Sequence, residues 1–139
     1  MGTVRNFEHP ASSRKRLLGL ASTCIDKYHE LTNSEKEQRD ILACIILCLI
    51  EVEKSVSTTI KSWEKRDYWV KAENFIQEWS WLPKLRSDLE VNYLQNTSTS
   101  IKDVINRLEK KLKSMDIKSS RVDNFWTGCE QKIQRKKGC

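Results

Sequence analysis

The sequence predicts an all-α protein, a single-domain antiparallel bundle of four to five helices in which the third helix is kinked or broken near Pro83. The 139 residues contain only four glycines and two prolines, too few for the turns of a hairpin-rich β architecture. Apolar residues recur every three or four positions over most of the chain, which is the period of an amphipathic helix. The length suits one domain, so residues 1–139 are expected to form a single unit.

The first two helices follow from apolar spacing and a start signal. After Ser12 and Ser13, a helical stripe is formed by Leu17, Leu20, Ala21, Cys24, Ile25, Tyr28 and Leu31. Ser34 and Glu37 have the spacing of a capping box, in which each side chain satisfies a backbone N–H of the other residue. The second helix is expected to run from there to about Trp63, roughly thirty residues and about 45 Å.

The middle of this second helix is apolar on every face over residues 41–50. A helix with that pattern must be covered all round. Either neighbouring helices of the same chain surround it, or a second protein molecule covers one side. The second alternative makes Ile46 and Cys48 candidate interface residues. Cys44 and Cys48, one turn apart among aliphatic residues, are expected to be inert core thiols.

A third helix is predicted over residues 68–79, where apolar side chains again repeat every three or four positions. Pro83 lacks a backbone N–H and should kink or end this helix near residues 80–82. Trp79 and Trp81 cannot share one helical stripe. A break between them places both inside; without one, Trp81 is exposed and is a candidate protein interface residue.

Beyond Pro83 the helical pattern resumes over residues 82–93, and the polar residues 96–100 are expected to form a loop. A fourth helix is predicted over residues 101–115. A shorter last helix is predicted over residues 122–133.

The positive charge is concentrated at the two ends of the chain. Residues 1–16 carry a net charge of +3 and residues 131–139 a net charge of +4, which together exceed the +6 of the whole chain. These basic terminal arms are candidate contacts for a phosphate backbone, because clustered Lys and Arg attract phosphate regardless of sequence. The candidate nucleic-acid contacts are Arg5, Arg14, Lys15, Arg16, Lys132, Arg135, Lys136 and Lys137.

Motifs for catalysis or metal binding are not found in the sequence. The glycines are isolated, so no phosphate-binding loop is predicted. The two histidines lack the partners of a metal site: Asp26 and His29 lie one turn apart, but a di-iron bundle needs two Glu-x-x-His motifs. We therefore expect no catalytic residues, no metal, no cofactor and no enzymatic activity.

The location expected from the sequence is cytoplasmic, with reduced thiols. Five cysteines are an odd number in a chain with a good apolar core, and the first ten residues lack an apolar signal-peptide segment. The longest apolar run has ten residues, well short of the ~20 that cross a bilayer, so no membrane association is expected.

The leading functional hypothesis is a non-enzymatic helical interaction or scaffold protein that self-associates or is a small subunit of a larger assembly. The alternative is a nucleic-acid-binding accessory subunit that contacts phosphates through its basic arms. In size, helicity and basic character the chain resembles the small helical subunits of RNA-guided nucleoprotein complexes, a resemblance that implies backbone contacts. A small-molecule pocket lined by Trp69, Phe75 and Trp79 is a third, minor hypothesis, and no small-molecule partner is expected.

Overall fold

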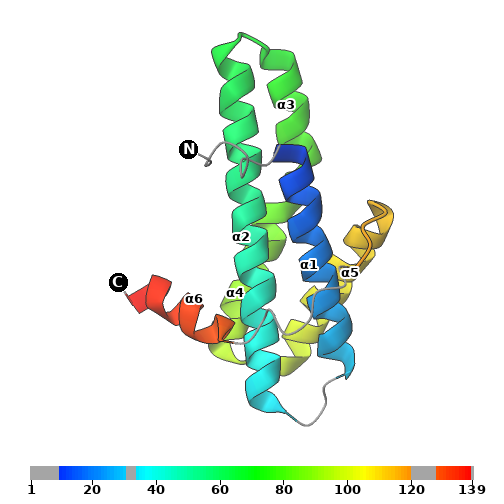
Figure 1. The fold of residues 1–139 in the computed structure, drawn as a ribbon, viewed down its shortest axis with the longest axis vertical. Helices are drawn as coiled ribbons and strands as arrows, with labels where there is room; N and C mark the ends of the chain where they lie inside the picture. Colours follow the sequence, from blue (N-terminus) through cyan, green and yellow to red (C-terminus); the bar gives the residue numbers. More distant parts are fainter. Residues whose placement is uncertain (1–9, 31–33, 120–127, 139) are drawn as a thin grey trace, which may run out of the picture.

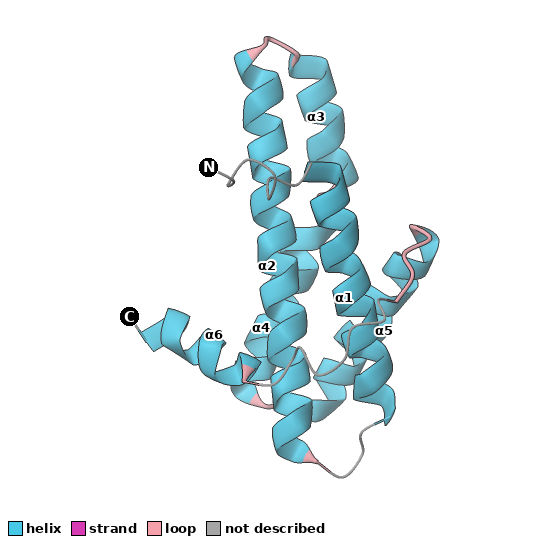
Figure 2. Cartoon of the chain, viewed as in Figure 1, coloured by secondary structure: helices cyan, strands magenta, loops and turns pink. Residues whose placement is uncertain are grey.

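The computed structural model describes residues 10–30, 34–119 and 128–138, with side chains up to Ile133. These residues form helices and short turns and contain no strand, which confirms the all-α class (Figures 1 and 2). The helices are α1 (Pro10–Glu30), α2 (Glu35–Lys65), α3 (Trp69–Glu78), α4 (Trp81–Gln95), α5 (Ser98–Ser114) and α6 (Cys129–Gly138). Ser34 caps α2, as its spacing to Glu37 predicts, with its side chain accepting the Glu37 N–H at 3.4 Å.

The longest helix, α2, forms the axis of the fold. Its 31 residues span about 46 Å. Figure 1 shows α1 and α3 following each other along one side of α2, with α4 behind it and α6 leading away from its lower part on the other side. Residues 41–46 are buried without interruption, and α1, α3, α4 and α6 all pack against α2. Helices of the same chain thus cover most of the apolar segment, as in the first alternative, and Leu47 and Ile50 are half-buried.

This burial changes the assignment of two candidate interface residues. Ile46 is fully buried, and Cys48 is only 7% exposed. Both side chains belong to the one hydrophobic core cluster. They are therefore used inside the chain and have no surface left for a partner.

The chain between α3 and α4 turns at Trp79 and Ser80. Pro83 is the third residue of α4, a position where the missing N–H costs nothing because the first helical N–H groups have no intrahelical acceptor. The turn brings the rings of Trp79 and Trp81 together, 5.9 Å apart and nearly parallel. Trp79 is buried and Trp81 half-buried, with the Lys111 ammonium 5.3 Å from the Trp81 ring centre. Trp81 therefore packs within the chain and is not the exposed anchor that an unbroken helix would have given.

Several of the remaining boundaries differ from the predicted ones. Residues 122–127 of the last predicted helix lie outside the described residues, and α6 begins at Cys129. The loop predicted over residues 96–100 is only Asn96 and Thr97, because Asn96 adopts the left-handed conformation that ends a helix in one residue. Residues 10–16 are the first turns of α1, and residues 131–138 belong to α6. The described parts of both predicted basic arms are therefore helical.

Arg39 joins α2 to the end of α4 and the start of α6. Its guanidinium lies 3.9 Å from the Tyr93 ring centre, donates to the Tyr93 carbonyl oxygen at 2.8 Å and pairs with Glu130 at 3.1 Å. The next residue, Asp40, accepts the Glu130 backbone N–H at 3.0 Å and so satisfies a donor in the first turn of α6. Two adjacent polar residues of α2 thus set the position of α6.

We predict that Ile46→Asp lowers the free energy of unfolding by about 4 kcal/mol or more, because it buries a charge with no partner. Urea unfolding followed by circular dichroism measures the change. Val91→Asp is the control, since Val91 is 47% exposed on α4, and it should cost less than about 1 kcal/mol. Equal losses in the two variants would contradict the central position of α2.

A second prediction concerns alkaline pH. Burial raises the pKa of Tyr93 to about 12, from an ordinary value of 10.0, although the nearby Arg39 opposes the shift. A raised pKa means that the folded protein favours the neutral phenol, so this contribution to stability is complete below pH 10 and is lost as the pH rises toward about 12. The free energy of unfolding should therefore fall less steeply over this range in Tyr93→Phe than in the wild type. Parallel curves from urea titrations across the range would contradict the burial of a neutral Tyr93.

Candidate protein interface

The α2–α3 hairpin reverses direction at Arg66, Asp67 and Tyr68, and none of these residues is a glycine. Asp67 has a φ of 61°, and the Tyr68 N–H donates to the Trp63 carbonyl oxygen at 2.9 Å across the turn. The Asp67 N–H donates to the Glu64 carbonyl oxygen at 3.1 Å, which completes a Schellman motif. Aspartate tolerates the left-handed conformation better than most residues. The chain therefore reverses within three residues, and α3 runs back along α2.

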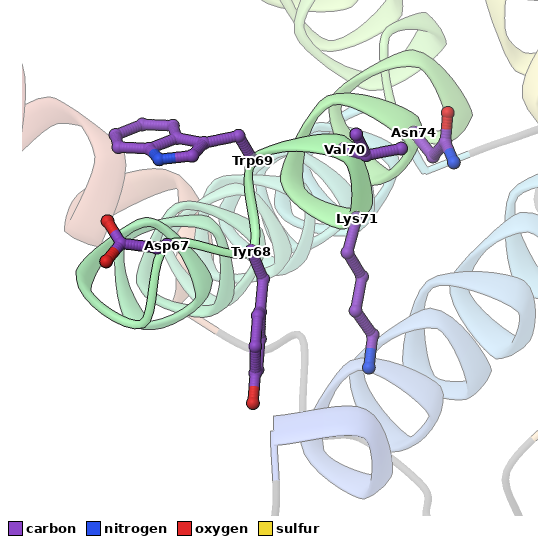
Figure 3. Close-up of a pocket in the computed structure, with 6 residues that line it drawn as sticks. All are labelled: Asp67, Tyr68, Trp69, Val70, Lys71 and Asn74. Atoms are coloured by element: carbon purple, nitrogen blue, oxygen red, sulfur yellow. The ribbon is translucent and has the colours of Figure 1, made fainter.

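The hairpin end exposes three consecutive large apolar residues. Tyr68 is 50% exposed, Trp69 59% and Val70 76%. Figure 3 shows that Tyr68 and Lys71 extend to one side of the turn and Trp69 to another. The six residues labelled there line an open pocket. Contiguous exposed apolar surface often marks a site of interaction with another molecule.

Next to this surface, an aromatic contact packs α3 against α2. The Trp63 and Phe75 rings meet edge to face at 4.9 Å, and the Lys71 ammonium lies 4.9 Å from the Trp63 ring centre. Ala72, the buried residue of α3, allows close approach to α2. The exposed residues therefore project from two helices that pack on each other, so less conformational entropy is lost when these residues bind.

The predicted apolar stripe of residues 68–79 is only partly buried. Tyr68, Trp69 and Ile76 are exposed, Phe75 is half-buried, and Trp79 is buried. The reason is the length of α2, which extends past the start of α1, so that the outer part of α3 packs on α2 alone. One feature of the sequence indicated this extension of α2, because the second predicted helix was longer than any other predicted helix.

Arg14, predicted as a nucleic-acid contact, is buried at the junction of α1, α2 and α3. Its guanidinium donates to the Ser55 and Thr59 hydroxyls, both at 3.1 Å. The same group lies 5.0 Å from the Phe75 ring centre and 5.8 Å from that of Trp79. Burial lowers the pKa of Arg14, and the charge of Glu78 opposes this shift. The side chain is therefore a structural contact and does not face a phosphate backbone.

The other predicted basic contacts are placed as follows. Lys15, Arg16 and Lys132 are exposed on α1 and α6. Arg5 lies outside the described residues, as do the side chains of Arg135, Lys136 and Lys137 on α6.

The aromatic pocket considered for a small molecule is not assembled. Phe75 and Trp79 pack on each other with ring centres 6.2 Å apart, whereas Trp69 is exposed at the hairpin end. Arg14 lies against the rings of both Phe75 and Trp79. The three aromatic residues therefore do not enclose one cavity.

Over residues 10–30, 34–119 and 128–138, no group of three or more His, Cys, Asp and Glu side chains is arranged to hold a metal ion. His29 lies 3.2 Å from the Glu109 carboxylate instead, an exposed contact between α1 and α5. No helix in the described part of the chain is long and apolar enough to cross a membrane.

Comparison of the chain with protein-family models, with curated proteins and with solved structures finds no match.

We predict that Arg14→Ala lowers the free energy of unfolding by about 1–3 kcal/mol, because it removes two hydrogen bonds and the contacts with two aromatic rings. The matched control is Lys15→Ala, which truncates the neighbouring exposed cation and should change stability by less than about 0.5 kcal/mol. Chemical denaturation of both variants at neutral pH measures the difference. If the two variants lost the same small amount, the structural assignment of Arg14 would fail.

Proposed function

We propose that this protein is a non-enzymatic helical interaction protein whose α2–α3 hairpin end, the surface formed by Tyr68, Trp69 and Val70, contacts another protein molecule. The observation that carries the proposal is the consecutive exposure of these three side chains on a packed hairpin. The molecule in contact is a second copy of the chain or a larger subunit of an assembly.

The residue types at the hairpin end favour a protein partner. Tryptophan and tyrosine are enriched among the residues that carry most of the binding energy at protein interfaces. Each presents a large rigid surface with a polar atom at its edge, so little conformational entropy is lost on binding. The neighbouring Lys65, Arg66, Asp67 and Lys71 carry charges of both signs, which suits the polar rim that surrounds such anchors.

The closed interior supports the same proposal. The apolar segment of α2 is covered by other helices, and Trp81 is packed between Trp79 and Lys111. Among the residues that the structure describes, the exposed large aromatic side chains, Tyr68 and Trp69, lie at the hairpin end. Val91 and Leu94 on α4 are also exposed, but they form an aliphatic pair without an aromatic anchor.

The nucleic-acid alternative loses one of its candidate contacts, because Arg14 binds Ser55 and Thr59. Lys15, Arg16 and Lys132 stay exposed. We retain this alternative as an outcome of the experiment below. It requires binding that weakens steeply with salt.

The test compares the double variant Trp69→Ala, Val70→Ser with the double variant Val91→Ser, Leu94→Ser, which truncates two exposed apolar side chains on α4 instead. Size-exclusion chromatography with light scattering, on protein purified from its native host at about 50 mM and about 500 mM salt, gives the mass of each species. We expect the wild type and the α4 variant to elute as an oligomer or a complex at both salts. The hairpin variant should elute at the mass of one chain, because it lacks the Trp69 ring and the Val70 side chain.

Two results would contradict the proposal. One is a wild type that elutes as a single chain at tens of micromolar without any bound protein. The other is wild-type protein that carries nucleic acid at low salt and loses it at high salt, which would support the alternative and direct mutation to Lys15, Arg16 and Lys132.

A further inference from the structure

A cleft lies between the start of α1 and the outer part of α2. Figure 1 shows the first turns of α1 beside α2, below α3. The cleft holds about 550 Å³, a volume within the range of small-molecule sites. Its polar lining consists of two arginines and three hydroxyl residues, namely Arg14, Thr58, Thr59, Ser62 and Arg66. None of the described residues that line it is acidic, so the cleft suits an anion.

Arg14 brings a charge without a counter-ion to this cleft. Its side chain is only 9% exposed, and Nη1 alone makes its two hydrogen bonds, to the Ser55 and Thr59 hydroxyls. Within the described part of the chain, Nε and Nη2 have no acceptor. The charge of Glu78 acts on Arg14, but no ion pair joins the two residues. An anion that reaches the remaining N–H groups would therefore stabilise this buried cation.

The side of α2 that borders the cleft carries a polar stripe. Ser55, Thr59 and Ser62 follow one another at intervals of four and three residues, which places them on one side of the helix. Arg66 continues the stripe four residues later. The Ser55 hydroxyl donates to the Pro10 carbonyl oxygen at 3.4 Å, which fixes the start of α1 against this side. The side chains of Ser62 and Arg66 have no partner among the described residues, so both are open to a ligand.

We propose that the cleft binds a small soluble phosphate monoester. The phosphate accepts hydrogen bonds from Arg14, Arg66 and the Ser62 hydroxyl. A dianion with three free oxygens matches two guanidinium groups and a hydroxyl better than a carboxylate does. The first residues of α1 also border the cleft, and a helix N-terminus favours the same negative charge.

The rest of the lining and the burial of Arg14 define the remainder of the ligand. The cleft is larger than a phosphate group, and Pro10, Ala11 and Trp63 add apolar surface to it. An ester group with one ring or a few carbon atoms fits against that surface. Arg14 is too deeply buried for a nucleic-acid backbone to reach it. The ligand is therefore a small molecule, which the sequence did not predict because the lining comes from two helices more than forty residues apart.

The test is isothermal titration calorimetry on the full chain with phenyl phosphate, inorganic phosphate and phenol at about 150 mM salt. We expect phenyl phosphate to bind with a dissociation constant below about 1 mM. Inorganic phosphate should bind about tenfold more weakly because it lacks the ring, and phenol should not bind because it lacks the charge. In nuclear magnetic resonance spectra, the backbone amide shifts that phenyl phosphate changes should map to residues 10–14 and 58–66.

Arg66→Ala should weaken the binding of phenyl phosphate about tenfold or more, since it removes a charge-assisted donor. The matched control is Lys65→Ala, which truncates the neighbouring exposed cation outside the lining and should change the affinity less than about twofold. Circular dichroism checks that each variant is folded. The hairpin variant Trp69→Ala, Val70→Ser should bind phenyl phosphate as the wild type does, so this test is independent of the proposed function.

The proposal is overturned if phenyl phosphate at about 10 mM does not bind, or if Arg66→Ala and Lys65→Ala weaken its binding equally. Amide shifts confined to α6 would also overturn it, because the phosphate would then lie elsewhere. Equal affinities for phenyl phosphate and inorganic phosphate would contradict the ester group. Protein that sediments with vesicles containing phosphatidic acid, but does not bind phenyl phosphate, would assign the cleft to a lipid head group and overturn the assignment to a soluble molecule.

Discussion

The rest of the structure depends on the complete burial of the middle of α2. A helix that is apolar on every face must be surrounded, and α1 alone covers only one side of it. The other helices that pack on α2, namely α3, α4 and α6, supply the remaining cover. Polar residues at the two ends of the apolar stretch fix the positions of α6 and α4 on α2. Arg39 and Asp40 bind the start of α6 at one end, and Glu53 pairs with Arg86 of α4 at the other.

Arg14 shows how a single buried cation joins three helices. It comes from α1, donates to two hydroxyls of α2 and lies against two aromatic rings at the end of α3 and the following turn. A buried guanidinium without these partners would be costly, so the contacts favour one relative placement of the three helices. This junction marks the point beyond which α2 and α3 continue alone. The exposed aromatic surface at the hairpin end results from that extension.

The hairpin end and the helical core differ in their surroundings. At the hairpin end, Tyr68, Trp69 and Val70 are exposed to water, which they would lose against another surface. In the core, four cysteines from α1, α2 and α6 are buried. Of the two regions, the exposed hairpin end is the one suited to association.

The sequence by itself determined the helical class, the cap at Ser34 and the burial of the middle of α2. These are local properties: spacing, capping and an apolar run act within a few turns of one helix. Residues 68–79 carry a helical apolar repeat, and only the tertiary structure showed that Trp69 and Ile76 on this stripe are exposed. Likewise, the contacts of Arg39 and Asp40 with Glu130 and the burial of Arg14 require elements distant in the chain to pack together. The periodicity of a helix gives the face that prefers burial, but whether that face is covered depends on the lengths and positions of the other helices.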